Sequence, residues 1–451
     1  MTARTCLSII LAAGLGTRMK SSLPKVMHEI GGLPLVGHVL KALAAAGSER
    51  IAVVTGPEAS ALEAFVYKQA PDARCYVQQD RLGTAHAALA ARPALDIDAD
   101  DVLVLFGDTP LVTPETIAMV RQVLADGADL AVLGFETGKP FGYGRLLTED
   151  GRLVAIREEK DASEEERRVT FCNSGIMGFA GRNALSLLEA VGNDNAKGEY
   201  YLTDAVEIAN ARGLKVVAVS GTETETQGIN TRAQLASCEA DFQERMRQGA
   251  MDKGCTLLAP QTVFFSHDTH LEADVLIEQN VVFGPGVKVA GGARIRAFSH
   301  LEGAVVGPGS VVGPYARLRP GAVLEADTRI GNFVEVKNAT FGAGAKANHL
   351  SYVGDASVGS GSNIGAGTIT CNYDGFLKHR TEIGAGSFVG SNSTLVAPVK
   401  LGDGVFVAAG SVITDDVLPD ALAFGRSRQS VKEGQAAALR RRLKAEKDRK
   451  S

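Results

Sequence analysis

The stretch Ala304-Val-Val-Gly-Pro-Gly-Ser-Val-Val-Gly-Pro-Tyr-Ala-Arg-Leu318 carries an apolar residue at every sixth position, at Val306, Val312 and Leu318. A period of six matches neither an α-helix nor an alternating strand. It is typical of a parallel β-helix, in which each hexad forms one short strand and a turn, and three hexads close a triangular coil. Large apolar side chains would fill the interior, and glycines would let the chain bend at the corners.

The same spacing extends from about residue 270 to residue 413, with occasional shifts of one position. Much of the unusual content of 51 glycines falls in this repeat and not in a linker. A glycine-rich antiparallel sandwich is the alternative, but the number of repeats disfavours it. The insert between Ile364 and Ile383 leaves the repeat and is expected to protrude as a loop, where function is often carried.

The composition describes a globular protein of more than one domain, since 451 residues exceed one ordinary core. The formal charge of −5 gives no reason to expect nucleic acid or a membrane as partner. Six cysteines are scattered without a C-x-x-C pair, which fits a reducing compartment, and we expect a cytoplasmic protein. The apolar run 7–13 is too short to span a bilayer, and we interpret it as a buried first strand.

Residues 1–230 alternate short apolar runs, expected to be strands, with longer helical patterns. This alternation predicts a mostly parallel, Rossmann-like α/β sheet, whose ligands bind beyond the carboxyl ends of the strands. Residues 231–250 predict a linker helix, and residues 251–426 form the predicted β-helix domain. Residues 427–451 are a basic tail, which we interpret as a solvated helix or a frayed end in preference to a nucleic-acid site.

A glycine-rich loop, Leu11-Ala-Ala-Gly-Leu-Gly-Thr-Arg-Met19, follows the first expected strand, and Leu23-Pro-Lys25 lies just beyond it. Such a turn lets backbone N–H groups approach phosphate oxygens, and Arg18 and Lys25 add positive charge. It is not a P-loop, because Thr-Arg follows its second glycine, and Met19 stands where a dinucleotide fingerprint needs a third glycine.

The longer string L-A-A-G-x-G-T-R-M followed by L-P-K resembles the signature of the sugar-phosphate nucleotidyltransferases. Further matches are Gln78 with Leu82-Gly83-Thr84, Phe106-Gly107-Asp108, Gly142-Tyr143-Gly144-Arg145, Glu158, Asn173-Ser174-Gly175, Gly198-Glu199-Tyr200-Tyr201 and Gly228-Ile229-Asn230. With the hexapeptide repeat and His349, residues 5 to 430 resemble the family of bifunctional N-acetylglucosamine-1-phosphate uridylyltransferases/glucosamine-1-phosphate N-acetyltransferases.

This resemblance implies two reactions on the way to cell-wall and lipopolysaccharide precursors. Glucosamine 1-phosphate would be N-acetylated by acetyl-CoA in a left-handed β-helix. Uridylyl transfer from UTP to N-acetylglucosamine 1-phosphate would follow in the N-terminal domain, with Mg²⁺ as cofactor and pyrophosphate as product. The resemblance also implies a homotrimer whose partners are these small molecules, with no nucleic acid and no membrane.

For the N-terminal site, the resemblance implies that Asp108 and Asn230 hold Mg²⁺, for which oxygen ligands are suited. Arg18 and Lys25 would offset phosphate charge during catalysis. The nucleotide and sugar contacts would be Leu11, Ala12, Ala13, Gly14, Lys25, Gln78, Gly83, Thr84, Gly144, Glu158, Asn173, Tyr201 and Asn230. Taken singly, Asp108 is equally typical of a turn, and Glu158 of a solvated charged run.

His349 lies within the repeat, where an isolated histidine is more often a packed or surface residue. Acylation of an amine needs a base near neutral pH, and imidazole is suited to that role. By resemblance, His349 is this base, and Glu335 and Asn372 orient the amino sugar or the base. The other implied contacts are Arg319, Lys337, Tyr352, Asn363, Tyr373 and Lys378 for the sugar phosphate, and Ala366, Ser391, Ala409 and Arg426 for acetyl-CoA.

Two other functions for the β-helix stay open at this point. It could be an oligomerisation spacer beside a single enzyme, although a spacer would not need the Asn348-His-Leu segment or the Asn372-Tyr-Asp-Gly loop. It could also resemble the β-helical carbonic anhydrases, which bind zinc. Between residues 300 and 430 only His300, His349 and His379 could serve as histidine ligands, and their spacing is not clustered.

Overall fold

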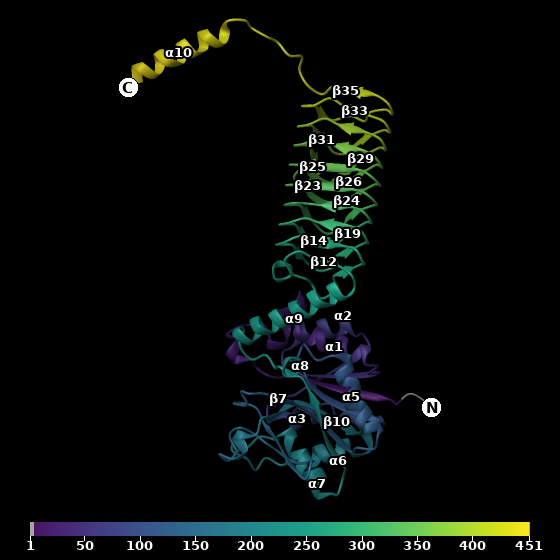
Figure 1. The fold of residues 1–451 in the computed structure, drawn as a ribbon, viewed down its shortest axis with the longest axis vertical. Helices are drawn as coiled ribbons and strands as arrows, with labels where there is room; N and C mark the ends of the chain where they lie inside the picture. The colour runs from purple at the N-terminus through teal and green to yellow at the C-terminus, as the bar shows by residue number, and fades with distance from the viewer. Residues whose placement is uncertain (1–3, 451) are drawn as a thin grey trace. The chain divides into compact units, whose positions relative to one another are not determined.

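The computed structural model describes residues 4–450 and divides into two compact units between Gln248 and Gly249 (Figure 1). Each unit has its own sheets. The helix α9 (Arg232–Asp252) includes the point of division. No helix in the described part of the chain is long and apolar enough to cross a membrane.

The N-terminal unit is built on a nine-stranded sheet with helices on both faces. The main strand order is β11 (Val216–Gly221), β7 (Leu130–Glu136), β10 (Phe171–Ala180), β6 (Asp101–Phe106), β1 (Cys6–Leu11), β4 (Arg50–Thr55) and β5 (Arg74–Val77). The helices are α1 (Leu35–Ala45), α2 (Ser60–Gln69), α3 (Thr84–Ala90), α4 (Arg92–Leu95), α5 (Pro114–Ala125), α6 (Gly181–Ala190), α7 (Ala205–Ala211) and α8 (Glu223–Thr226).

Strand β1 shows why the sheet is covered on both faces. All six of its residues are buried. Leu7 and Ile9 belong to one hydrophobic cluster, and Cys6 and Ile10 belong to another on the opposite face. Because side chains alternate along a strand, a run that is apolar throughout needs cover on both sides. The predicted Rossmann-like α/β architecture is confirmed.

Strand β10 is antiparallel to both of its neighbours, which was not predicted. Its register shifts between Asn173 and Met177, and Gly175 within this irregularity has φ 83°. A Cβ atom on Gly175 would lie 2.3 Å from the ring of Phe106. The sequence Asn-Ser-Gly interrupts the apolar pattern here, so the pattern of apolar runs does not indicate this strand. The hairpin of β8 (Arg145–Glu149) and β9 (Arg152–Arg157) extends the sheet beside it.

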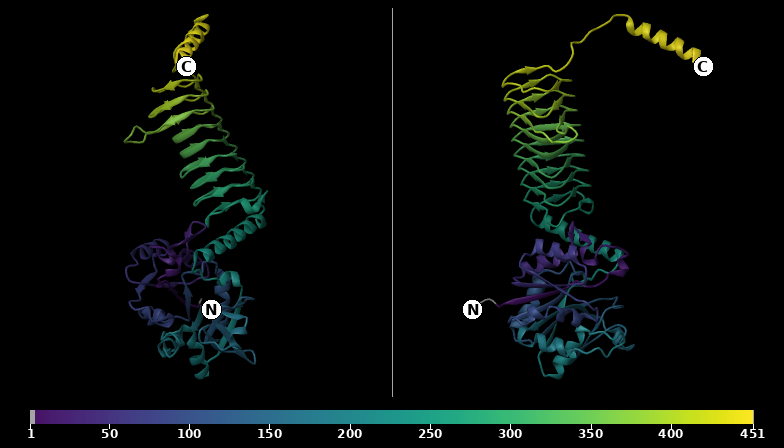
Figure 2. Two further views of the ribbon diagram at one scale, coloured as in Figure 1. Left: turned by 90° about the vertical axis from the view of Figure 1, so that its left-hand side faces the viewer. Right: turned by 180° about the vertical axis from the view of Figure 1, so that it is seen from behind.

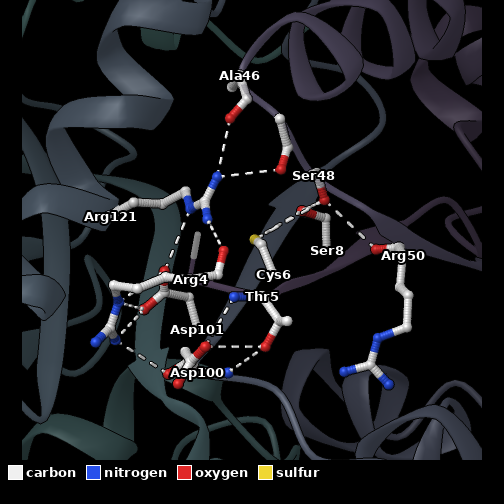
Figure 3. A network of polar contacts seen from close by, with 11 residues as sticks. Arg4, Thr5, Cys6, Ser8, Ala46, Ser48, Arg50, Asp100, Asp101 and Arg121 are labelled. Carbon is white, nitrogen blue, oxygen red and sulfur yellow. Dashed lines mark hydrogen bonds and ion pairs between the residues drawn. The ribbon is translucent and has the colours of Figure 1, made fainter. Parts of the chain in front are cut away.

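A polar network closes the starting edge of β1 and β6 (Figure 3). Asp101, the first residue of β6, has no exposed surface and accepts hydrogen bonds from Arg4 (2.6 Å) and Arg121 (3.2 Å). Thr5 donates through its backbone N–H to Asp100 at 2.8 Å. These contacts lie at the opposite end of the strands from Asp108, which follows β6.

The C-terminal unit is a β-helix made of short parallel strands, as predicted. One face contains β12 (Thr256–Leu257), β14 (Leu276–Ile277), β17 (Arg294–Ile295), β20 (Val311–Val312), β23 (Arg329–Asn332), β25 (Lys346–His349), β27 (Asn363–Ile364), β30 (Phe388–Val389), β33 (Phe406–Val407) and β35 (Leu422–Ala423). Along this face the interior positions Ile277, Ile295, Val312, Ile330 and Ala347 follow one another at 17 or 18 residues, which corresponds to three hexads per coil.

The other strands of the β-helix form a 14-stranded sheet. They are β13 (His270–Leu271), β15 (Val282–Phe283), β16 (Lys288–Val289), β18 (His300–Leu301), β19 (Ala304–Val306), β21 (Arg317–Leu318), β22 (Ala322–Leu324), β24 (Glu335–Phe341), β26 (Tyr352–Val358), β28 (Ile369–Cys371), β29 (Thr381–Ile383), β31 (Thr394–Val396), β32 (Val399–Leu401) and β34 (Val412–Ile413). The predicted insert leaves the coil between β28 and β29, and Figure 2 (left) shows it projecting from one side. The basic tail contains an exposed helix, α10 (Gln435–Lys450).

Candidate active sites

A cavity of about 240 Å³ opens beyond the carboxyl ends of β1 and β6. The predicted residues that line it are Leu11, Ala12, Ala13, Gly14, Lys25, Gln78, Gly83, Thr84 and Asp108. They lie at or after the ends of three strands, β1, β5 and β6, so the parallel sheet brings them together at one edge. Arg18 lies outside this lining, exposed in the short 3₁₀ helix Thr17–Met19.

The glycine-rich loop is held close to the segment that carries Lys25. Gly16 has φ 60°, and a Cβ atom there would lie 2.7 Å from the Cβ of Lys25. Both the left-handed conformation and the close approach therefore require glycine. Gly14 is exposed, and nothing lies within 4 Å of where its Cβ would be, so a ligand can approach the backbone there.

Lys25 and Asp108 line the cavity, and Lys25 also contacts Asn230, which is not among the lining residues. The Lys25 ammonium donates to the Asp108 carboxylate and, at 3.1 Å, to Oδ1 of Asn230. Asp108 is buried, and the backbone N–H of Asn230 donates to Gln234 in the first turn of α9 at 2.8 Å. The two oxygens therefore form a pair that already binds a cationic group.

Two of the predicted nucleotide and sugar contacts, Gln78 and Gly83, lie side by side. Gln78 Nε2 donates to the carbonyl oxygen of Gly83 at 3.2 Å. Gly83 has φ 123°, and a Cβ atom there would lie 2.4 Å from the carbonyl oxygen of Tyr200. Only glycine fits where these two backbone segments cross.

Gly144, Glu158 and Asn173 form a second group, which does not line the 240 Å³ cavity. Asn173 N–H donates to the Gly144 carbonyl at 2.8 Å, and a Cβ on Gly144 would lie 3.4 Å from a Glu158 oxygen. Burial raises the pKa of Glu158. Burial also raises the pKa of Tyr201 to about 12, and the buried Tyr201 hydroxyl has no hydrogen-bond partner within the described chain.

Arg81 was not predicted, although it lies between Gln78 and Gly83. It lines the cavity, and its Nε donates to the carbonyl oxygen of Ala13 at 2.7 Å. It thus holds the glycine-rich loop and adds a second positive charge to the cavity lining, beside that of Lys25. A single arginine in a polar stretch carries no specific signal in the sequence, and only the fold brings it to the loop.

His349 ends β25 on the surface of the β-helix. It lines a second cavity, of about 300 Å³, together with Arg296, Arg329, Asn332 and Asn348. Its Nδ1 lies 2.7 Å from Oδ1 of Asn332 on the preceding coil. The other histidines of the zinc hypothesis have separate surroundings: His379 is bonded to Asp374 at 2.8 Å in the insert, and His300 lies on β18.

Three residues that were predicted to hold the sugar phosphate, Arg319, Lys337 and Lys378, are cationic and lie near one another on the β-helix. The strand register Arg317↔Glu335 places Arg319 beside Lys337 on adjacent coils. Contact with the Lys378 side chain, followed by its charge, lowers the pKa of Lys337. Arg319 donates to Glu335 at 2.8 Å, so the carboxylate predicted to orient the substrate or base is bonded to a guanidinium.

Hydrogen bonds within the insert, and between the insert and the preceding coil, hold it in place. Asp374 accepts hydrogen bonds from the backbone N–H groups of Phe376 (2.8 Å) and Leu377 (2.7 Å). Asn372 donates to the buried carboxylate of Asp355, which also accepts from Asn338 at 2.6 Å. Burial alone would raise the pKa of Asp355, but the two amide donors and the nearby lysines lower it.

The residues predicted to contact acetyl-CoA follow one corner of the β-helix. Ala366, Ser391 and Ala409 lie on successive coils, and the N–H of Asn392 donates to the Ala366 carbonyl at 2.7 Å. Arg426 lies beyond them, with its Cδ 3.7 Å from where a Cβ of Gly410 would be. Asn363, on β27, is paired with Lys346 in register, and Tyr373 is paired with Lys378 across the insert.

Residues 8–173 match the family model described as MobA-like NTP transferase domain, and residues 380–415 match that of bacterial transferase hexapeptide (six repeats). The protein named "Bifunctional protein GlmU" of Azorhizobium caulinodans is 61% identical over 98% of both chains. Proteins of the same name from Chelativorans sp. and Agrobacterium fabrum are 60% and 57% identical, over 100% and 99% of both chains. The chain belongs to the GlmU family. The predicted family resemblance is confirmed, and this GlmU-family chain is a bifunctional enzyme with uridylyltransferase and acetyltransferase activities.

Proposed function

We propose that the two activities use the two clusters described above. The cavity at the carboxyl ends of β1 and β6 would transfer a uridylyl group from UTP to N-acetylglucosamine 1-phosphate. The surface around His349 would transfer an acetyl group from acetyl-CoA to glucosamine 1-phosphate, which supplies the substrate of the first site. The observation that carries the proposal is that a cluster of Lys25 with two side-chain oxygens lies in one unit, whereas His349 with its nearby cations lies in the other.

In uridylyl transfer, a phosphate oxygen of the sugar phosphate attacks the α-phosphorus of UTP. The new P–O bond forms as the bond to the bridging oxygen breaks, and pyrophosphate leaves. The backbone of residues 11–14 would hold the phosphates, and Lys25 with Arg18 would offset their charge. Gln78, Gly83 and Thr84 would hold the base. Gly144, Glu158 and Asn173 would hold the sugar. Catalysis would rest on positioning and electrostatics.

Asp108 and Asn230 would bind Mg²⁺. The chemistry of the pair fits the ion, because one carboxylate and one amide oxygen converge and both already bind an ammonium group. When bound, the ion would neutralise charge on the phosphates. Lys25 would then be free to contact a phosphate oxygen.

In acetyl transfer, the amino nitrogen attacks the thioester carbonyl, so an N–C bond forms and the C–S bond breaks. His349 would take the proton from nitrogen and pass it to the leaving thiolate. Arg319, Lys337, Tyr352 and Lys378 would hold the sugar phosphate, with Glu335, Asn363, Asn372 and Tyr373 around the sugar. Ala366, Ser391, Ala409 and Arg426 would contact acetyl-CoA.

We also propose that the chain acts as a homotrimer in the cytoplasm. The stacked β-helix supports this assembly, since a solenoid offers long flat faces for side-by-side packing. The formal charge of −5 and the unpaired cysteines are consistent with the cytoplasm.

Two assays on one preparation test the division of labour. Pyrophosphate release from UTP and N-acetylglucosamine 1-phosphate reports one activity, and thiol release from acetyl-CoA and glucosamine 1-phosphate reports the other. Asp108→Ala should abolish only pyrophosphate release, and His349→Ala should reduce only thiol release, by roughly 10²–10⁴-fold. Loss of both activities in either folded variant would refute the proposal.

A further inference from the structure

Asn332 is the side chain that contacts the imidazole of His349. The two residues are register partners on β23 and β25, and Oδ1 of Asn332 lies 2.7 Å from Nδ1 of His349. We infer that Asn332 is a positioning residue for acetyl transfer, whose amide oxygen selects the tautomer in which His349 can act as a base. This inference rests on the proposed role of His349.

The backbone around this pair is held in place on both sides. A Cβ atom on Gly331 would lie 2.0 Å from the carbonyl oxygen of Asn348, so the close approach of β23 to β25 requires glycine. Leu350 donates its N–H to the Asn332 carbonyl at 3.1 Å. Phe333 stacks on Tyr315 with ring centroids 5.3 Å apart, which fixes the chain directly after Asn332. The short side-chain contact is therefore built into the coil geometry.

The direction of the hydrogen bond determines which imidazole nitrogen is free. A carbonyl oxygen only accepts, so Nδ1 must carry the proton and donate it to Asn332. Nε2 then has the lone pair and can receive the proton that leaves the amine nitrogen as the N–C bond forms. After the C–S bond breaks, Nε2 returns that proton to the thiolate. In the other tautomer, Nε2 would carry a proton and could not act as the base.

The groups around the imidazole of His349 are cationic or uncharged, apart from Glu335, and Asn332 is an uncharged hydrogen-bond partner for the ring. Arg296 and Arg329 line the same cavity, and Lys346 begins the same strand. Asn363 on β27 is uncharged. Glu335 is bonded to Arg319 at 2.8 Å. An amide orients the ring without favouring imidazolium, as a carboxylate in contact with it would.

Two substitutions of Asn332 distinguish the effect of orienting the imidazole from the effect of placing a charge beside it. Asn332→Ala removes the acceptor, and kcat for thiol release should fall about 10- to 100-fold with KM for glucosamine 1-phosphate nearly unchanged. Asn332→Asp keeps an acceptor, so kcat at its optimum should stay within about tenfold of the parent. Because the added carboxylate favours imidazolium, the acidic limb of the pH–rate profile should move to higher pH by about one unit.

The uridylyltransferase activity of the same preparations controls for folding of the chain, and should not change. Asn280→Ala, at an exposed turn of the same β-helix, is a matched asparagine control and should retain both activities. An Asn332→Asp enzyme as slow as Asn332→Ala would show that the amide donates to the ring, which overturns the inference. So would an unchanged kcat in Asn332→Ala.

His349→Ala separates this inference from the proposed function. If His349→Ala loses acetyl transfer while Asn332→Ala keeps it, only the positioning role is wrong. If His349→Ala keeps acetyl transfer, the assignment of the base is wrong and the role of Asn332 falls with it.

Discussion

Charged side chains in the proposed nucleotide site are held by residues far away in the chain. Lys25 is bonded to Asp108 and Asn230, which are 83 and 205 positions away, and Arg81 holds the carbonyl oxygen of Ala13 across 68 positions. These bonds place positive charge where phosphates are proposed to bind before a substrate arrives. Catalysis by fixed charges depends on such positioning, since the groups need not reorganise during the reaction.

Replacing Tyr201 by phenylalanine should change folding stability and substrate binding in opposite directions. Its hydroxyl is buried without a hydrogen-bond partner in the described chain, which costs folding free energy. Tyr201→Phe should raise the free energy of unfolding by about 1 kcal/mol, measured by urea denaturation. If the hydroxyl binds the sugar, KM for N-acetylglucosamine 1-phosphate should rise by up to roughly tenfold. An unchanged KM would remove Tyr201 from the sugar site.

Asp204 gives a prediction on pH. Burial raises its pKa from 3.8 to about 6. The folded state therefore binds this proton more tightly than the unfolded state, and stability is lost as the pH rises from about 4 through 6. Asp204→Asn should raise the free energy of unfolding by roughly 1–2 kcal/mol at pH 7 and not at pH 4. Equal effects at both pH values would contradict this.

The two ends of strands β1 and β6 have different roles, since the starting ends contribute to stability and the carboxyl ends lead to the proposed site. Their carboxyl ends lead to the glycine-rich loop and Asp108, whereas their starts contain the Asp101 network of Figure 3. The hydrophobic residues between the two ends are buried on both faces. One element therefore supports the site at one end and is anchored by ion pairs at the other.

Removing the central carboxylate of this network should destabilise the N-terminal unit. Asp101→Ala leaves the mostly buried Arg121 without its anionic partner and should lower the free energy of unfolding by about 3–5 kcal/mol. Denaturation followed by loss of pyrophosphate release would measure the effect. At 25 °C without denaturant, kcat for uridylyl transfer should remain near the parent value. A large fall in kcat in the folded variant would show that the two ends of the strands are coupled.

Each unit of the whole molecule has its own sheets and its own proposed site. The cavity around Lys25 is lined only by residues of the N-terminal unit. In contrast, the residues proposed for acetyl transfer lie on the outer surface of a β-helix, and His349 is exposed. An exposed base is consistent with a site completed by a neighbouring copy of the chain.

Subunit dissociation should therefore affect the two activities differently. The enzyme should sediment at three times the chain mass of 47.2 kDa. Dilution or mild denaturant that dissociates it should abolish thiol release and leave pyrophosphate release largely intact. Full acetyltransferase activity in a demonstrated monomer would refute the trimeric site.

The sequence by itself determined the β-helix, the alternating α/β domain and the glycine-rich loop. All three are patterns among near neighbours: a period of six, short apolar runs, and two glycines after a strand. Such patterns reflect local geometry, so they can be read without knowing what lies across the fold. The insert between β28 and β29 was likewise visible as a break in the period.

Only the tertiary structure decided which distant groups touch. Arg81 donates to the Ala13 carbonyl, and Glu335 is bonded to Arg319. Strand β10 pairs antiparallel with its neighbours, and its register with β7 shifts once. The contact between Asn332 and His349 exists because successive coils vary between 17 and 18 residues, and that choice sets which side chains stack. A shift of one residue turns a side chain to the other face, and packing between coils selects the register.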